Sequence, residues 1–476
     1  MIRPAAVLLS FLASGVAVAQ QVDRSRAPVP GPAPTLELPA VQQARLSNGI
    51  AVHLVEMHEV PVVEVSLVLR AGASQDPAGK FGLASLTAGM LDEGAGARSA
   101  LEVADAAALL GASLGTGSSY DASFVRVGVP VARVEPALAL MADVVQRPTF
   151  PPAELERLRA DRLTSMLQAL DNPAAVASLA FPRLLYGTSH RYGTPEMGTP
   201  EVLKRLAEDD VRTFYAAHYR PEHAVLIVAG DVTRDALMPL LEHAFGGWRV
   251  TAPLDKPEPL PPAEQVKARR VVLIDKPGAP QSQVRIGWIG VPRLTPDYFP
   301  LTVLNTVLGG SFTSRLNTNL RETHGYAYGA GSQFAMRRAA GPFVAAAGVQ
   351  TDKTAEAVRE CFNEFSAIRT PIPAEEFAKA QRNVALGLLG EFETTEDMVA
   401  RLQSKIVYAL PDDVYRTYVQ NVMAVTPDRV ADVAQTYIDP SRFLVVVVGD
   451  RASVEAPLRA LDLGPVTVLS VGEALW

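Results

Sequence analysis

The sequence has a single cysteine among its 476 residues, so it cannot form an internal disulfide bond. This residue, Cys361, lies in the helical-looking stretch TAEAVRECFNEF, where a packed thiol is a better interpretation than a nucleophile. A chain of this length can bury enough apolar surface to fold without cross-links.

An excess of basic residues is also absent. The chain has 44 Lys and Arg against 51 Asp and Glu, which gives a formal net charge of -7. This balance argues against nucleic acid or an anionic membrane surface as a partner. The sequence contains no G-x-x-x-x-G-K-[ST] loop and no CxxC pair, which excludes the common nucleotide-binding and redox classes.

The first residues, MIRPAAVLLSFLASGVAVAQQ, are typical of a secretory signal peptide: one basic residue, a short apolar run and a small-residue end. The apolar run is far shorter than the roughly 20 residues that a membrane-spanning helix needs. We therefore expect residues 1–19 to be removed on export and the mature chain to have no membrane span. The expected location is the bacterial periplasm, although secretion outside the cell fits the same signal.

Two proline-rich stretches divide the mature chain. Residues 20–40 form a leader that contains APVPGPAP, and residues 251–268 form a linker that contains DKPEPLPP. These stretches predict an N-terminal domain at 41–250 and a C-terminal domain at 269–470.

The two halves resemble each other in sequence. The segment HYRPEHAVLIVAGDV corresponds to TYIDPSRFLVVVVGDR, and 219 residues separate Pro221 from Pro440 and Asp231 from Asp450. The strand-like VVEVSLVLRAG corresponds to SQVRIGWIGV in nearly the same register. Since this period is far too long for a solenoid repeat, it indicates a tandem duplication in which each copy has its own core.

Each half mixes strand and helix patterns. AVLIVAGDV is continuously apolar, as expected for a strand buried on both faces. PAELERLRADRLTSMLQAL and AEEFAKAQRNVALGLLGEF have the start signals and apolar spacing of helices. The pattern predicts the α+β class.

Several longer motifs carry a family resemblance. They are SNGIAVHLVEMHEVPVVEVSLVLRAGASQD, FGLASLTAGMLDEGA, the DNP turn at 171–173, YGTPEMGTPE, YRPEHAVLIVAGD and LGGSFTSRLNTNLRETHGYAYGAG. Together these motifs resemble the pitrilysin and insulinase family of zinc peptidases, which includes mitochondrial processing peptidase, over roughly residues 40 to 470. The resemblance implies two homologous tandem domains of the mitochondrial processing peptidase-like fold, forming half of a clamshell chamber.

The resemblance fails at the zinc site. Active members carry His-x-x-Glu-His on a helix, where two imidazoles four residues apart bind zinc and the Glu activates water. Here Ser85 and Gly89 stand at the two His positions and Ala88 at the Glu position, while Ser165 stands where the resemblance places the third ligand. Zinc prefers nitrogen, sulfur or carboxylate ligands, so we expect no metal and no cofactor in this chain.

Two other patterns imitate catalytic sites. His53 and His58 lie in a strand-like segment, where residues an odd number apart point to opposite faces, so they do not form a metal pair. The string GASLG at 111–115 matches a nucleophile elbow, but it follows a helix and precedes a strand, the reverse of what an elbow requires.

The family's other catalytic block is present. By position in R-E-x-x-G-x-x-Y, the resemblance assigns Arg321 and Tyr328 to hydrogen-bonding the scissile carbonyl as it becomes an oxyanion. Such preorganised donors stabilise developing negative charge. The alternative is an ordinary surface cation paired with Glu322 and a packed strand tyrosine. Gly309, Gly310 and Ser311 form either a helix terminus or a flexible loop that receives an extended peptide substrate.

Two functions fit these observations. In the first, the chain is the non-catalytic subunit of an exported heterodimeric metallopeptidase, and a sister subunit brings the zinc. The chain then takes part in peptide-bond hydrolysis only within that complex. In the second, it is an inert peptide-binding or scaffold protein of the same fold. A neighbouring reading frame with His-x-x-Glu-His discriminates between them.

Overall fold

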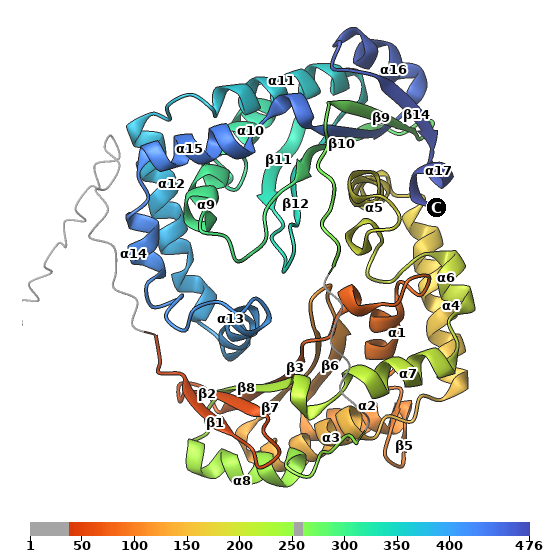
Figure 1. Ribbon diagram of the computed structural model, residues 1–476, viewed down its shortest axis with the longest axis vertical. Helices are drawn as coiled ribbons and strands as arrows, with labels where there is room; N and C mark the ends of the chain where they lie inside the picture. Colours follow the sequence, from red (N-terminus) through yellow and green to blue (C-terminus); the bar gives the residue numbers. More distant parts are fainter. Residues whose placement is uncertain (1–37, 252–259) are drawn as a thin grey trace, which may run out of the picture. The chain divides into compact units, whose positions relative to one another are not determined.

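The computed structural model describes residues 38–251 and 260–476 (Figure 1). The predicted signal peptide 1–19, most of the predicted leader and residues 252–259 of the predicted linker lie outside the described residues.

The N-terminal half contains a six-stranded sheet in the order β1-β2-β8-β3-β7-β6. The central strand β3 pairs antiparallel with both neighbours, whereas β2 and β8 are parallel. The strands are β1 (Gln42–Arg45), β2 (Ala51–Glu56), β3 (Val62–Leu69), β6 (Ser113–Ser118), β7 (Ser123–Pro130) and β8 (Ala224–Gly230).

The C-terminal half contains a second six-stranded sheet, in the order β11-β12-β10-β13-β9-β14. Its strands are β9 (Arg270–Asp275), β10 (Gln281–Ile289), β11 (Ala327–Phe334), β12 (Pro342–Gln350), β13 (Leu444–Gly449) and β14 (Val466–Ser470). Read from β6 and from β11, the two sheets share chain order and strand direction up to the last strand. That strand differs, because β1 is antiparallel to β2 whereas β14 is parallel to β9. The repeat and the predicted α+β class are confirmed.

Helices flank both sheets. Those of the N-terminal half are α1 (Leu83–Gly89), α2 (Ala100–Leu110), α3 (Val134–Gln146), α4 (Pro152–Ala169), α5 (Pro173–Tyr186), α6 (Pro200–Arg205), α7 (Glu208–His218) and α8 (Arg234–Phe245). Those of the C-terminal half are α9 (Tyr298–Leu308), α10 (Arg315–Asn317), α11 (Thr354–Ala367), α12 (Ala374–Gly387), α13 (Thr395–Val407), α14 (Tyr418–Met423), α15 (Pro427–Tyr437), α16 (Arg451–Ala460) and α17 (Val471–Leu475).

The local sequence explains these elements. Every residue of β8 and of β13 is buried, as their continuous apolar runs predict. Helix α4 begins at Pro152, a favoured first helical residue, and covers the predicted helical stretch. Asn172 starts α5 because its side chain accepts hydrogen bonds from the first backbone N–H groups of the helix.

Two helices pack on the sheet of the opposite half (Figure 1). Helix α5 contacts β10 and β13, where Val176, Ala180 and Phe181 join a core with residues of the C-terminal sheet. Helix α13 contacts β3 and β8 of the N-terminal sheet in turn. Each half therefore buries one sheet face with a helix from the other half.

A carboxyl group lies at the contact between α13 and the N-terminal sheet. Glu64 of β3 is buried, and burial together with the charge of Glu396 in α13 raises its pKa to about 7, while Arg126 acts in the opposite direction. Arg126 Nη2 donates to Gln403 Oε1 of α13 at 2.6 Å. The folded chain therefore binds this proton more tightly than the unfolded chain does.

We expect stability to depend on pH through Glu64. Because its folded pKa is raised, its contribution is fully present below the unfolded value of 4.5 and is lost as the pH rises through 7. Glu64→Gln should remove this loss and raise the free energy of unfolding at about pH 8 by about 1–2 kcal/mol. Urea unfolding at about pH 5 and about pH 8 measures the effect. Glu59→Gln, at an exposed carboxylate, is the control, and equal behaviour of the two variants contradicts the prediction.

The cysteine is a packed helix residue, as the sequence predicts. Cys361 lies buried in α11, within the core of the C-terminal half. Burial raises the pKa of its thiol to about 12, so the thiolate, which is the reactive form, is scarce at neutral pH.

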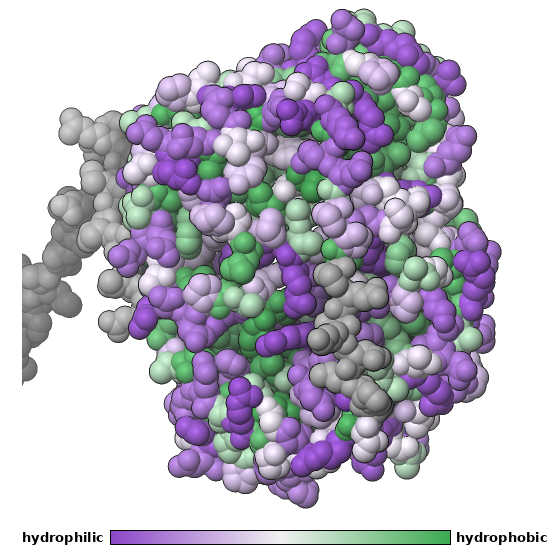
Figure 2. Space-filling model, viewed as in Figure 1, coloured by the Kyte–Doolittle hydropathy of each residue, from purple (hydrophilic) through white to green (hydrophobic). Residues whose placement is uncertain are grey.

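The surface is polar over most of the face shown in Figure 2, with smaller hydrophobic areas between the polar residues. Among the helices at 38–251 and 260–476, none combines the length and the apolar character that a bilayer span requires.

Candidate functional site

Helix α1 is held at its N-terminus by a buried ion pair. The carboxylate of Asp76 accepts hydrogen bonds from the backbone N–H groups of Gly82 and Ala84, both at 2.7 Å. Arg191 Nη2 donates to the same carboxylate at 2.9 Å, and both side chains are almost completely buried. A negative charge at a helix N-terminus is favourable, so this pair fixes where α1 begins.

Two glycines allow the loop at 192–201 to approach the start of α1. Gly82 has φ +110°, and a Cβ there would lie 2.6 Å from the carbonyl oxygen of Met197. A Cβ on Gly198, which has φ +78°, would collide with the carbonyl oxygen of Phe81. Any other residue would separate the two segments and shift α1.

The face of α1 that resembles a zinc site carries no metal ligand. Ser85 and Gly89 are both half-buried, as expected for positions four residues apart on one helix face. Ala88 is completely buried and has no polar side-chain atom to act as a base.

Helix α4 brings an arginine to this face. Arg162 Nη2 donates to the carbonyl oxygen of Ser85 at 2.8 Å. Ser165 is exposed, and its hydroxyl donates to the carbonyl oxygen of Asp161 on its own helix at 3.0 Å. Sequence reasoning missed Arg162. The available signal was the glycine at position 89, which leaves space for a large side chain from a neighbouring helix.

These residues do not fit zinc. A serine hydroxyl, a glycine and a guanidinium supply none of the imidazole, thiolate or carboxylate ligands that zinc prefers. Elsewhere in residues 38–251 and 260–476, no group of three His, Cys, Asp or Glu side chains is arranged to hold a metal ion. The described residues therefore support no catalytic step through a metal.

The two sequence patterns that imitate catalytic sites form none in the structure. His53 lies half-buried in β2, where burial and the charge of Lys405 lower its pKa. His58 is exposed after the strand, with Nδ1 2.7 Å from Asp231, and this carboxylate raises the pKa of the ring. The GASLG string links α2 to β6, so the order is helix then strand, as expected.

Arg321 lies in a π-helical turn, Thr318–Thr323, and the turn contacts β11. Its side chain is 39% exposed, with Nε 3.2 Å from Glu322 Oε1. The guanidinium lies 4.7 Å from the ring centre of Phe312, which is itself 67% exposed. The guanidinium is therefore positioned by an aromatic ring and one acid, with part of its surface open to a further partner.

Tyr328 is the most exposed aromatic side chain of this region. It lies in β11, the end strand of the C-terminal sheet, and it is 87% exposed. An exposed phenol on an end strand contributes little to a core, so packing does not explain it. The ladder between β11 and β12 shifts register between Ala327 and Ala330, on either side of this tyrosine.

The glycine pair ends a helix. Gly309 and Gly310 both donate backbone hydrogen bonds to the carbonyl oxygen of Asn305 at the end of α9. A Cβ on Gly309 would lie 2.4 Å from Ser332 N, and Ser311 Oγ donates to the carbonyl oxygen of Thr306. Of the two interpretations, the helix terminus describes the geometry, and substrate binding by these residues stays a prediction.

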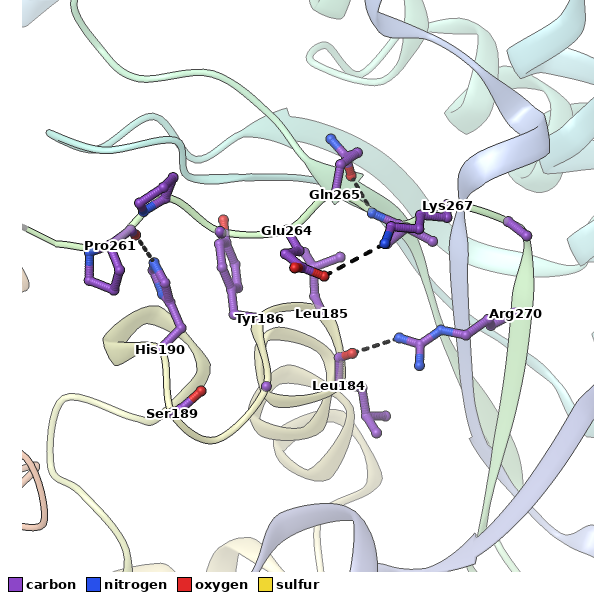
Figure 3. A pocket seen from close by; sticks show the side chains of 15 residues that line it. Leu184, Leu185, Tyr186, Ser189, His190, Pro261, Glu264, Gln265, Lys267 and Arg270 are labelled. Carbon is purple, nitrogen blue, oxygen red and sulfur yellow. Dashed lines mark hydrogen bonds and ion pairs between the residues drawn. The ribbon is translucent and has the colours of Figure 1, made fainter.

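A pocket of about 810 Å³ lies between the end of α5 and residues 261–270 (Figure 3). His190 is within hydrogen-bonding distance of the carbonyl oxygen of Pro261, and its ring stacks on Tyr186 at 5.1 Å between centres. Arg270 donates to the carbonyl oxygen of Leu184 at 2.8 Å. None of the predicted site residues lines this pocket, and its polar groups bond the chain to itself, so it supplies no catalytic arrangement.

The repeated sheet topology and the helix α1 define a peptidase-like protein built from two tandem α+β domains. Two family models match the chain in the same order: "Insulinase (Peptidase family M16)" at residues 51–186 and "Peptidase M16 inactive domain" at residues 205–384. The chain belongs to the M16 peptidase family, the pitrilysin-like group that its motifs indicate.

Curated proteins that are similar to this chain are named as zinc proteases. An uncharacterized zinc protease of Streptomyces coelicolor is 24% identical over 419 residues, covering 81% of this chain and 88% of the relative. An uncharacterized zinc protease of Mycobacterium leprae is 26% identical over 288 residues, which is 60% of this chain and 64% of that protein.

Solved structures show the same fold. The M16 inactive domain of Pseudomonas fluorescens has a TM-score of 0.80 at 26% identity, covering 86% of this chain and 98% of that one. A protease from Helicobacter pylori has a TM-score of 0.81 at 19% identity, covering 87% and 100%.

Proposed function

We propose that this chain is the non-catalytic subunit of an exported heterodimeric zinc metallopeptidase. The zinc comes from a sister subunit of the same family, and this chain supplies Arg321 and Tyr328 to the sister's site. The observation that carries the proposal is the contrast between the two halves. Helix α1 has no ligand or base, whereas Arg321 and Tyr328 are exposed and have no attacking group among the described residues of their own chain.

The proposed chemistry needs only donors from this chain. The sister subunit's zinc would supply the activation of water. As negative charge develops on the oxygen of the peptide carbonyl, the guanidinium of Arg321 and the phenol of Tyr328 would each donate a hydrogen bond to it. Exposure is required for this role, because the carbonyl lies on another molecule. The 87% exposure of Tyr328 meets that requirement.

Peptide binding is supported by the sheet ends. Strands β6 and β11 each end a sheet, and β6 contacts α1. An end strand offers backbone N–H and C=O groups to which an extended peptide can add as a further strand. This binding mode depends mainly on the backbone of the peptide and little on its side chains, in keeping with a peptide or unfolded protein as substrate.

Export to a bacterial periplasm is part of the proposal and rests on the N-terminal sequence, which is typical of a signal peptide. The alternative is a peptide-binding or scaffold protein of the same fold with no chemistry in any partner. The replaced residues of α1 favour both functions equally, and the exposed Arg321 and Tyr328 favour the first.

The test compares two preparations of the mature tagged chain, one made alone and one captured from its native periplasm. Each is assayed with a quenched peptide, with and without a zinc chelator. We expect chelator-sensitive hydrolysis only in the native capture, together with a co-purifying subunit that contains His-x-x-Glu-His. Hydrolysis by the chain alone contradicts the proposal, and no hydrolysis in either preparation favours the scaffold alternative.

A further inference from the structure

The guanidinium of Arg162 fills the space between the two positions on α1 that correspond to zinc-binding histidines. Its Nη2 atom donates to the carbonyl oxygen of Ser85 at 2.8 Å. The same atom lies 2.9 Å from where a Cβ on residue 89 would stand, so a side chain there would have to displace the guanidinium. Gly89 and Arg162 are therefore complementary in shape.

This guanidinium has no acidic partner in the part of the chain that the structure describes. Its Nη1 atom is buried without a hydrogen-bond partner, and burial lowers the pKa of Arg162 with no carboxylate acting in the other direction.

Two acids that follow α1 in the chain, Asp92 and Glu93, have other partners. Glu93 pairs with Arg157 at 2.5 Å, and Asp92 accepts from Thr116 at 3.1 Å. An arginine remains protonated in proteins, so a full positive charge occupies this place.

We propose that Arg162 excludes divalent metal ions from the N-terminal half, as a barrier separate from the loss of the ligands. A cation placed on this face of α1 meets the guanidinium at short range in a partly buried environment, where the repulsion between like charges is strong. Restoring the two imidazoles is then insufficient to restore metal binding. Metal exclusion by Arg162 involves the N-terminal half alone and does not depend on the proposed partner.

The test uses the full mature chain and measures metal binding, not activity. Ser85→His/Gly89→His places two imidazoles four residues apart, a pair that by itself binds divalent metals. We expect this variant to bind Zn²⁺ no more tightly than the wild-type chain. Adding Arg162→Ala should tighten binding by about tenfold or more, to one equivalent, in equilibrium dialysis. Co²⁺ should then give the absorption of a bound ion.

The control adds Arg442→Ala, which removes an exposed positive charge in the C-terminal half, to the same double variant. It should leave Zn²⁺ binding unchanged. Arg162→Met, which keeps bulk without charge, should restore binding as Arg162→Ala does. The proposal is overturned when the double variant already binds as tightly as the triple variant, or when both fold and neither binds.

A second pair of substitutions covers the case in which the double variant does not fold. Ser85→His/Arg162→Glu leaves Gly89 unchanged and replaces the guanidinium with a carboxylate ligand. We expect it to bind Zn²⁺, whereas Ser85→His alone should not. Equal binding by these two variants overturns the proposal.

Discussion

Arg321→Ala and Tyr328→Phe should each lower the kcat/KM of the natively captured complex about 100- to 1000-fold, the usual effect of removing one oxyanion donor. The reason is that each substitution removes a hydrogen bond that forms only as the carbonyl oxygen gains charge. The reduction should appear mainly in kcat. Quenched-peptide kinetics with the captured complex measure it.

Both side chains are exposed and neither supports a core, so a loss of activity in these variants would not result from unfolding. The melting temperature of the chain should therefore stay the same in both variants, and the zinc-bearing subunit should still co-purify. Arg442→Ala, which removes another exposed guanidinium, is the matched control. Unchanged kcat/KM in the Arg321 and Tyr328 variants argues that these residues are ordinary surface side chains and donate no hydrogen bond to the reacting carbonyl.

Breaking the buried ion pair between Asp76 and Arg191 at the N-terminus of α1 should cost about 3–5 kcal/mol of folding free energy. This is the usual effect of leaving one buried charge without its partner. In Arg191→Ala, the carboxylate of Asp76 keeps its two backbone donors but loses its counter-ion, while both positions are at most 2% exposed. Urea unfolding of the isolated chain measures the difference.

The control for this prediction is Arg205→Ala, which removes an exposed ion pair with Glu201 on α6 and should change stability by less than about 1 kcal/mol. If Arg191→Ala and Arg205→Ala unfold at the same urea concentration, the buried pair does not hold α1 as described. A double variant, Asp76→Asn/Arg191→Met, should be less destabilised than Arg191→Ala, because no buried charge remains.

The sequence was sufficient to predict much of the fold. The continuous apolar runs of β8 and β13 predict strands, because a strand buried on both faces shows no alternation of polar and apolar residues. The exchange of α5 and α13 between the halves was not predictable in this way. Each helix has an apolar face, but local periodicity does not specify which of the two sheets, that of its own half or that of the other, packs against this face.

The candidate site was predictable where it depends on position in a motif. Ser85, Ala88 and Gly89 follow from one helix register, and the structure places all three on α1. Arg162 was not predictable, because α4 also carries Arg157 and Arg159, and such a series is typical of a solvated helix face. The partner of each arginine is settled only by the packing of α4 against other helices.

Because Cys361 is buried, the natural chain has no reactive thiol that would compete with an introduced cysteine for a label. A cysteine introduced at an exposed position, such as Ser165 in α4, becomes the only group that maleimide dyes modify at neutral pH. A second introduced cysteine at Ser441, near the start of β13, then gives one fluorophore in each half. Energy transfer between the two dyes reports whether the halves move when a peptide binds, with no need to remove any native residue.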